Sequence, residues 1–265
     1  MIEQSEVVAM LNDLAPTSLA ESWDNVGWQV RCGTAPITGI LCSVDATEAV
    51  IEEARQRGAN LVIAHHPLLF RPLHAVDTSS RVGGVLASAL RGNISIISAH
   101  TNWDAAPGGI SWALARRLGL TPETILQPSP LLPHAGLGVI AHADTPIDTH
   151  QLIRRARVDL ASSVVTLVGT AAEHTCIALM GGSGTSGISA AAESGATLYI
   201  TADVRYHEAQ EAESLGLSLI VIDHGASELP GMAELGQVLA SRLSVPVSLS
   251  QTRTSPWRYI AHETN

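Results

Sequence analysis

The most informative segment of this chain is Leu61-Val62-Ile63-Ala64-His65-His66-Pro67. Its apolar, β-branched run predicts a short buried strand, and this strand ends at two adjacent histidines followed by a proline. Imidazole is the commonest side-chain ligand for transition metals. Open α/β sheets bind their ligands beyond the carboxyl ends of their strands, so the paired histidines stand where a binding site is expected.

Two later apolar runs end in a similar way. One leads into His100-Thr101-Asn102-Trp103-Asp104, and the other leads into Asp223-His224-Gly225-Ala226-Ser227-Glu228. The segment Ala106-Pro107-Gly108-Gly109 disfavours a long helix, so we expect Asp104 to lie in a loop. We predict that the three strand ends converge on one metal site.

The paired histidines belong to a β-α-β unit. A predicted strand at 39–44 is followed by a helix that ends at Gly58 and by the strand that carries His65 and His66. This order is typical of a right-handed crossover between parallel strands. Asp45 follows the first strand, where it either caps the helix, as Thr47 does, or faces the site.

The same alternation continues to a last predicted helix at 234–243, which predicts an α/β fold of two similar lobes with the metal site in the cleft between them. A proline-rich patch at 122–133 is the best candidate for the boundary. We therefore place an N-terminal lobe at residues 1–124 and a C-terminal lobe at 125–265, with the C-terminal lobe supplying His224 and Glu228 to the shared site.

Composition narrows the classes of partner. The formal net charge of −10 leaves no basic stripe for a nucleic-acid backbone, so nucleic acid is an unexpected partner. No apolar run is long enough for a membrane helix and the acidic start lacks a signal-peptide core, so we expect a cytoplasmic protein without a membrane partner. The three scattered cysteines form no disulfide framework and no paired metal motif, so nitrogen and oxygen must hold any metal.

The ligand candidates comprise three imidazoles and two carboxylates: His65, His66, Asp104, His224 and Glu228. Five ligands with a carboxylate able to bridge suit two divalent ions better than one. Ligands of this kind favour Zn, Fe, Mn, Co or Ni.

Other polar residues have less defined roles. We expect His100 to act as a ligand, as an orienting partner or as a general base. His207, together with Asp203, follows another predicted strand and is a candidate acid/base group, although Asp203 is equally suited to capping a helix. The segment 21–30, with Trp23 and Asp24, forms a wall of the site, a structural loop or a subunit contact.

A glycine-rich loop offers a competing site. The sequence from Gly182 to Gly187 matches the GxGxxG pattern between a predicted strand and a predicted helix, and acidic Asp203 follows about 20 residues later. Such a loop either cradles a phosphate on its backbone N–H groups or forms a tight structural turn.

These motifs together resemble the GTP cyclohydrolase 1 type 2 homologue family, also called the Nif-three-like family. The resemblance rests on five segments in order along nearly the whole chain: Trp23-Asp24-Asn25-Val26-Gly27, Ala64-His65-His66-Pro67, His100-Thr101-Asn102-Trp103-Asp104, the Gly182 loop with Thr201-Ala202-Asp203, and His224 with Glu228. Gly225 and Ala202 depart from the family pattern, which puts the shape of the substrate pocket, rather than the ligands, in question.

The resemblance implies a toroidal homohexamer with two divalent metal ions per subunit facing an inner cavity. It implies that His66 and Asp104 hold one ion, that His65 and His224 hold the other, and that Glu228 bridges them. The expected function is a metal-dependent hydrolase acting on a small molecule, with ring opening of a purine nucleotide such as GTP as the named activity. Two alternatives stay open: a metal-binding adaptor or scaffold without turnover, and a nucleotide-binding protein that uses the Gly182–Gly187 loop.

Overall fold

The computed structural model describes residues 1–258 and divides the chain into two compact units. The first unit contains Met1–Gly109 and Gly231–Thr254, and the second contains Ile110–Pro230 together with the segment that starts at Ser255. Helix α9 (His224–Arg242) begins in the second unit and continues into the first, so the first unit is built from two separate parts of the sequence. We describe each unit by itself.

The first unit is a five-stranded sheet with the strand order β1-β4-β3-β2-β11. Three of its four strand pairs, β11–β2, β2–β3 and β3–β4, are parallel, and β1 is antiparallel to β4. The elements of this unit other than α9 are α1 (Gln4–Leu14), η1 (Thr17–Leu19), β1 (Gly27–Val30), β2 (Ile40–Ser43), α2 (Glu48–Gln56), β3 (Leu61–Ala64), α3 (Arg81–Gly92), β4 (Ser95–Ser98), α4 (Thr101–Ala105) and β11 (Val247–Leu249).

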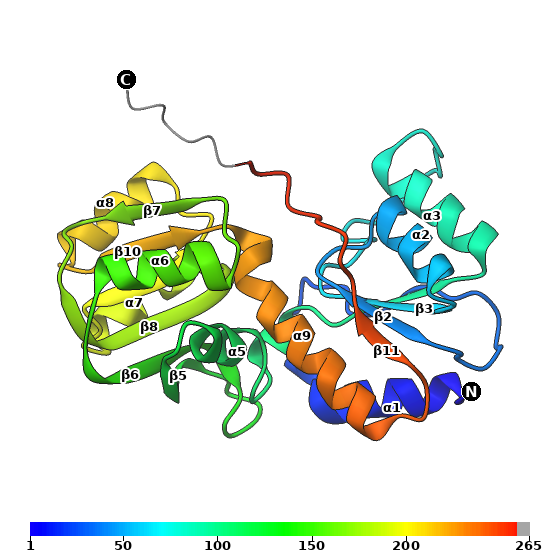
Figure 1. The fold of residues 1–265 in the computed structure, drawn as a ribbon, viewed down its shortest axis with the longest axis horizontal. Helices are drawn as coiled ribbons and strands as arrows, with labels where there is room; N and C mark the ends of the chain where they lie inside the picture. Colours follow the sequence, from blue (N-terminus) through cyan, green and yellow to red (C-terminus); the bar gives the residue numbers. More distant parts are fainter. Residues whose placement is uncertain (259–265) are drawn as a thin grey trace. The chain divides into compact units, whose positions relative to one another are not determined.

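Side chains along each strand of the first unit point alternately to the two faces of the sheet, and helices pack on both faces. Leu41, Val62 and Ile96 share a buried core with apolar residues of α2 and α3, which lie side by side in Figure 1. Neighbouring residues on the strands point to the other face. There, a Cβ at Gly236 of α9 would lie 3.5 Å from Cys42 Sγ, so this helix packs closely on β2.

The second unit is a six-stranded mixed sheet with the order β5-β6-β8-β9-β10-β7. The strands β8, β9 and β10 are parallel, and the outer pairs are antiparallel. Its elements are α5 (Ile110–Arg117), β5 (Thr121–Pro128), β6 (Gly136–Asp148), α6 (Thr149–Asp159), β7 (Val165–Val168), β8 (Glu173–Ser183), η2 (Thr185–Gly187), α7 (Ile188–Glu193), β9 (Leu198–Ala202), α8 (Tyr206–Ser214) and β10 (Ser218–Ile222).

Helices cover both faces of the second sheet as well. One buried core joins α5 and α6 to the strands, through residues such as Leu114 and Leu152, and another joins α7 and α8, through Ile188 and Ala212. The predicted α/β class is therefore confirmed in both units.

The predicted lobe boundary differs from the observed division. The prolines that suggested a linker at 122–133 lie partly on β5, which is an edge strand, and an edge strand tolerates proline because one side of it needs no ladder partner. The return of the chain to the first unit after Pro230 was not predicted either, since a proline inside an unbroken helix is uncommon.

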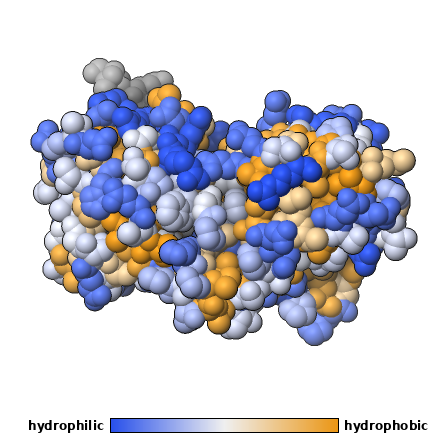
Figure 2. Space-filling model, turned by 90° about the horizontal axis from the view of Figure 1, so that it is seen from below, coloured by the Kyte–Doolittle hydropathy of each residue, from blue (hydrophilic) through white to orange (hydrophobic). Residues whose placement is uncertain are grey.

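The face of the molecule drawn in Figure 2 carries hydrophobic residues interspersed with hydrophilic ones. Isolated exposed apolar residues are normal on protein surfaces. Among the helices of residues 1–258, none combines the length and the apolar character that crossing a membrane requires.

Candidate metal centre

Two of the candidate ligands follow β3 directly. His65 is fully buried, and its Nδ1 lies 2.8 Å from the carbonyl oxygen of Ala99. Because a carbonyl only accepts hydrogen bonds, Nδ1 of His65 carries the proton, and Nε2 is the nitrogen left with a lone pair for a metal. His66 uses the same arrangement: its Nδ1 lies 2.8 Å from Asp45 Oδ1.

His100 is held by Asp24, which comes from the segment before β1. The two are joined by a 2.8 Å hydrogen bond between His100 Nδ1 and Asp24 Oδ1. The other carboxylate oxygen of Asp24 accepts hydrogen bonds from the backbone N–H and the hydroxyl of Thr101. Burial raises the pKa of Asp24, but the hydrogen bonds from His100 and Thr101 outweigh it and bring the pKa to about 2. Asp24 is therefore an ionised acceptor that fixes the ring of His100.

These three histidines form one cluster in the first unit. The rings of His65 and His66 have their centroids 5.1 Å apart, and the His65 and His100 centroids are also 5.1 Å apart. One nitrogen from each ring lies within 4.8 Å of the others, close enough for the three rings to share an ion. Asp104 borders the cluster, with an oxygen 3.5 Å from Nε2 of His65.

The segment from His100 to Asp104 is a single helical turn, α4, rather than the predicted loop. The turn forms because the backbone N–H of Asp104 donates to the carbonyl of His100. Asn102 fixes its position, since its side chain accepts from the N–H of His100 and donates to the carbonyl of Ala15. The glycines after Ala106 still stop a longer helix, as the sequence indicated.

The second unit contributes His224 and Glu228. Both lie in the first turn of α9, where the spacing of four residues places them on one side of the helix, with His224 Nε2 2.8 Å from Glu228 Oε1. From the sequence we expected these two residues in a loop after the strand, with a helix only from residue 234, whereas α9 begins at His224. The Nδ1 of His224 lies 2.6 Å from Asp203 Oδ2.

Gly182 lies against this pair. It adopts a positive φ of 67°, and a Cβ on it would come within 2.6 Å of Glu228 Oε1 and 3.5 Å of His224 Nε2. Its N–H donates to the hydroxyl of Ser227, and its carbonyl accepts from Thr201. Only glycine therefore fits the left-handed backbone and the close approach to the carboxylate together.

The rest of the glycine loop is a compact turn. The carbonyl of Gly184 accepts from the Tyr199 hydroxyl and from the N–H of Gly187, and a Cβ at Gly187 would clash with the Tyr199 ring. The following helix, α7, is only six residues long. The geometry thus gives the glycines a packing role, and Asp203 orients His224.

His207, the second candidate acid/base group, is exposed on the first turn of α8. Its Nδ1 lies 3.1 Å from Gln210 Oε1, and its ring contacts that of Tyr206. Its proposed proton transfer stays a prediction.

Sequence reasoning missed what Asp24, Asp45 and Asp203 share: each carboxylate receives the Nδ1 of one histidine. Asp45 was expected mainly to cap α2, but Thr47 is the N-cap. Their position in the sequence could have revealed this role, because Asp45 and Asp203 each follow a strand, as the histidines do.

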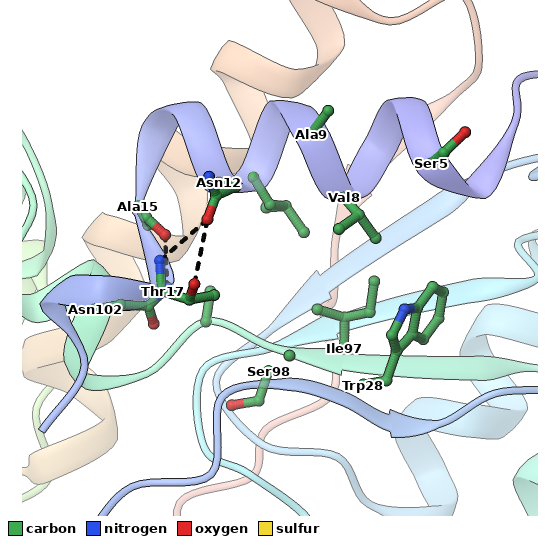
Figure 3. A pocket seen from close by; sticks show the side chains of 13 residues that line it. Ser5, Val8, Ala9, Asn12, Ala15, Thr17, Trp28, Ile97, Ser98 and Asn102 are labelled. Atoms are coloured by element: carbon green, nitrogen blue, oxygen red, sulfur yellow. Dashed lines mark hydrogen bonds between the residues drawn. The ribbon is translucent and has the colours of Figure 1, made fainter. Parts of the chain in front are cut away.

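A separate cavity of 440 Å³ lies in the first unit between α1 and the strands β1 and β4. Figure 3 shows Val8 on α1 facing Ile97 and Trp28 across it. The asparagines at its wall bond neighbouring groups: Asn12 accepts from Thr17, and Asn102 donates to the carbonyl of Ala15. This lining is mainly apolar and offers no cluster of ionisable groups for catalysis.

Comparisons with known proteins place these residues in a wider context. The family model for Duf34/NIF3 (NGG1p interacting factor 3) matches residues 2–256. A protein of Clostridium perfringens named GTP cyclohydrolase 1 type 2 homolog is 32% identical, over 97% of this chain and 99% of its own length. A Helicobacter pylori protein named GTP cyclohydrolase 1 type 2 is also 32% identical, over 84% of this chain and 86% of its own. The crystal structure of a Staphylococcus aureus hypothetical protein matches with a TM-score of 0.90 and 28% identity, over 98% of this chain and 99% of that one.

Proposed function

We propose, since this chain belongs to the Duf34/NIF3 family, that it binds divalent transition-metal ions through its histidines and carboxylates and uses them to hydrolyse a small molecule. One observation carries the metal-binding half of the proposal. His65, His66 and His224 each engage an oxygen acceptor through Nδ1, which directs Nε2 toward a ligand. Metal-ligating histidines almost always have this second hydrogen bond, because it fixes the tautomer and the ring orientation.

The chemistry of the donor set suits the proposed ions. Imidazoles and carboxylates favour Zn, Fe, Mn, Co or Ni over ions that prefer thiolates or oxygen alone. The thiols do not compete, because burial raises the pKa of Cys42 to about 12 and also raises the pKa of Cys32 and Cys176.

The proposed ligands are those predicted from the sequence: His65, His66, Asp104, His224 and Glu228. The family resemblance implies two ions, one held by His66 and Asp104, the other by His65 and His224, with Glu228 as the bridge. It also implies a homohexamer, which sedimentation of the purified protein tests directly: a monomer at micromolar concentration would contradict it.

Bound divalent ions supply Lewis-acid polarisation of a substrate oxygen and lower the pKa of water. His100 would move protons beside them: Asp24 holds Nδ1, so Nε2 is the atom that accepts or returns a proton. The name of the Helicobacter pylori relative makes ring opening of GTP the first reaction to test.

Cobalt substitution tests the proposal. We expect Co(II) added to chelator-treated protein to give visible absorption bands typical of nitrogen and oxygen ligands, without the near-ultraviolet band of a thiolate ligand. The His66→Ala variant should lose the part of this absorption that comes from the ion held by His66 and Asp104, and a Cys176→Ala control should keep the full bands. A thiolate band, or an unchanged spectrum in the His66 variant, would contradict the ligand set.

Turnover is measured on the same metal-loaded protein by following GTP and its products by chromatography. We expect product formation that disappears when chelator is added. Stable metal binding with intact GTP and with an intact panel of other small molecules would favour the adaptor without turnover.

A further inference from the structure

Two exposed aromatic side chains border the histidine cluster of the first unit. Trp23 is 59% exposed and Phe70 is 49% exposed, although aromatic residues make up only 3% of the chain and Phe70 is its single phenylalanine. Trp103, by contrast, is buried in the core. Trp23 and Phe70 differ from isolated exposed apolar residues because they lie together beside the cluster.

The two rings and His100 form a corner. The centroids of Trp23 and Phe70 are 5.9 Å apart with their planes at 70°, and His100 lies 6.3 Å from Trp23 and 6.5 Å from Phe70, also near a right angle. Rings at these separations touch edge to face. They leave no space between them for an ammonium group, which excludes an aromatic cage for a cation. A ligand can only lie against their exposed outer surfaces.

Hydrogen bonds between residues close in sequence to Trp23 and Phe70 hold the two loops together. Asn25 donates to the carbonyl of Leu69 over 2.7 Å, and Gln29 accepts from the N–H of Leu69 over 3.0 Å. The amide of Gln29, which is buried, also donates to the carbonyl of Asn25 over 2.7 Å. Since Asp24 is fixed to His100, the adjacent Trp23 keeps its place relative to the cluster. The aromatic corner is therefore preorganised, as a binding surface needs to be.

We propose that Trp23 and Phe70 form a stacking platform for a planar aromatic or heteroaromatic ring of the substrate, such as a nucleobase. This inference rests on the proposed function, because it names the class of substrate that the histidine cluster receives. A planar ring fits the platform because it can stack on one aromatic face while its edge meets the other. His100, whose ring contacts both aromatic rings edge to face, then stands next to the bound ring.

The test compares ligands that differ only in the ring. Binding of GMP, AMP and CMP to the metal-loaded protein is measured by calorimetry, with ribose 5-phosphate as the ring-free match. We expect each nucleotide to bind at least about 10-fold more tightly than ribose 5-phosphate, the effect of stacking one base. Equal affinities for the nucleotides and for ribose 5-phosphate would overturn the platform, as would the absence of binding by all four.

Substitutions of Trp23 and Phe70 test whether these two rings cause the difference in affinity between the nucleotides and ribose 5-phosphate. Trp23→Ala and Phe70→Ala should each lower nucleotide affinity, by about 10-fold for Trp23, with unchanged ribose 5-phosphate affinity and metal content. Trp23→Phe should restore most of the loss, which a merely structural defect would not allow. Trp257→Ala is the matched control, since Trp257 is 56% exposed and belongs to the other unit. Undiminished nucleotide binding in the Trp23→Ala variant would overturn the proposal.

Repeating the titrations on chelator-treated protein separates the two proposals. If the protein takes up no metal but still binds nucleotides more tightly than ribose 5-phosphate, the proposed function is contradicted and the stacking platform is supported. If the protein takes up metal but binds all four ligands equally, the stacking platform is contradicted and the metal-binding proposal is supported.

Discussion

The two units supply candidate ligands in different ways. The first unit brings three imidazoles together on loops that follow β3 and β4, and one nitrogen of each lies within 4.8 Å of the others. The second unit offers one imidazole and one carboxylate from a single turn of α9, packed against Gly182. Metal sites commonly need three or four protein ligands. The first cluster thus has enough donors for an ion by itself, whereas the pair in the second unit needs further ligands.

The largest effect should come from breaking the first cluster. We expect His65→Ala to weaken metal binding by more than the ~100-fold that loss of an orienting partner can cause, because a buried ligand is removed. Competition with a chromogenic chelator measures the change. His174→Ala is the control: His174 is equally buried in the second unit, but its nitrogens bond Thr149 and Thr197. A loss of metal affinity in that control equal to the loss in His65→Ala would contradict a specific role for His65.

A smaller effect should follow from disturbing the second pair through Gly182. In Gly182→Ala the added Cβ meets the end of the Glu228 side chain, so the carboxylate moves while the backbone stays. We expect metal affinity to fall by about 10- to 100-fold. Gly195→Ala carries the same positive-φ strain but has no atom within 4 Å of the new Cβ, so it should lose stability alone. Equal metal affinities in the two variants would break the proposed link between Gly182 and Glu228.

The orienting carboxylates allow a finer comparison between the units. We expect Asp45→Asn to lower metal affinity by about 10-fold, because an amide cannot hold the Nδ1–H of His66 as strongly. Asp203→Asn should have a smaller effect, since half of that side chain is exposed and water can replace its hydrogen bond to His224. Isothermal titration with Zn or Mn gives both values. A larger loss of metal affinity in Asp203→Asn than in Asp45→Asn would contradict this expectation.

The smallest effect concerns how the two sequence segments of the first unit are joined. Glu53 accepts hydrogen bonds from Ser250, Gln251 and Thr252 in the segment after β11. Burial raises the pKa of Glu53, but these hydrogen bonds outweigh it and bring the pKa to about 2 from the usual 4.5. The folded state therefore binds the proton less readily than the unfolded state. The stabilisation is present above pH ~4.5 and is lost as the pH falls toward 2.

We accordingly expect Glu53→Gln to lower the free energy of unfolding by about 1 kcal/mol at pH 7, and by much less near pH 2, with metal affinity unchanged. Urea unfolding at both pH values measures this. Glu52→Gln serves as the comparison, because Glu52 makes only a solvent-exposed contact with Arg55 and Gln56 and should change stability little. A Glu53 effect that persists unchanged at pH 2 would contradict the account.

The sequence predicted the strand ends and most helix starts well, but it missed the start of α9. His65 and His66 follow a strand of four buried apolar residues, which leaves little choice of structure. His224 and Glu228 were expected in a loop, yet α9 begins at His224 although local propensity disfavours a helix with Gly225 and Pro230. In α9, packing of residues such as Leu235 and Leu239, both fully buried, overrides that propensity.

The histidine-orienting carboxylates show a second limit of sequence reasoning. Asp24 lies 76 residues from His100 and Asp203 lies 21 residues from His224, and no local pattern reports contacts across such distances. The GxGxxG match shows that one pattern can have two origins. Of the two alternatives that the sequence left open, the close contacts of Gly182, Gly184 and Gly187 with Glu228, Thr201 and Tyr199 favour the tight structural turn.

Elemental analysis of the tag-free protein, with His65→Ala and Glu228→Ala beside it, measures whether the chain holds a dinuclear metal centre. We expect about two transition-metal ions per chain in the unaltered protein. We also expect reduced metal content in both variants, with circular dichroism showing that the fold is retained. An unaltered protein that holds no metal after incubation with Zn, Mn or Fe(II) would contradict this expectation, and so would variants that keep their full metal content.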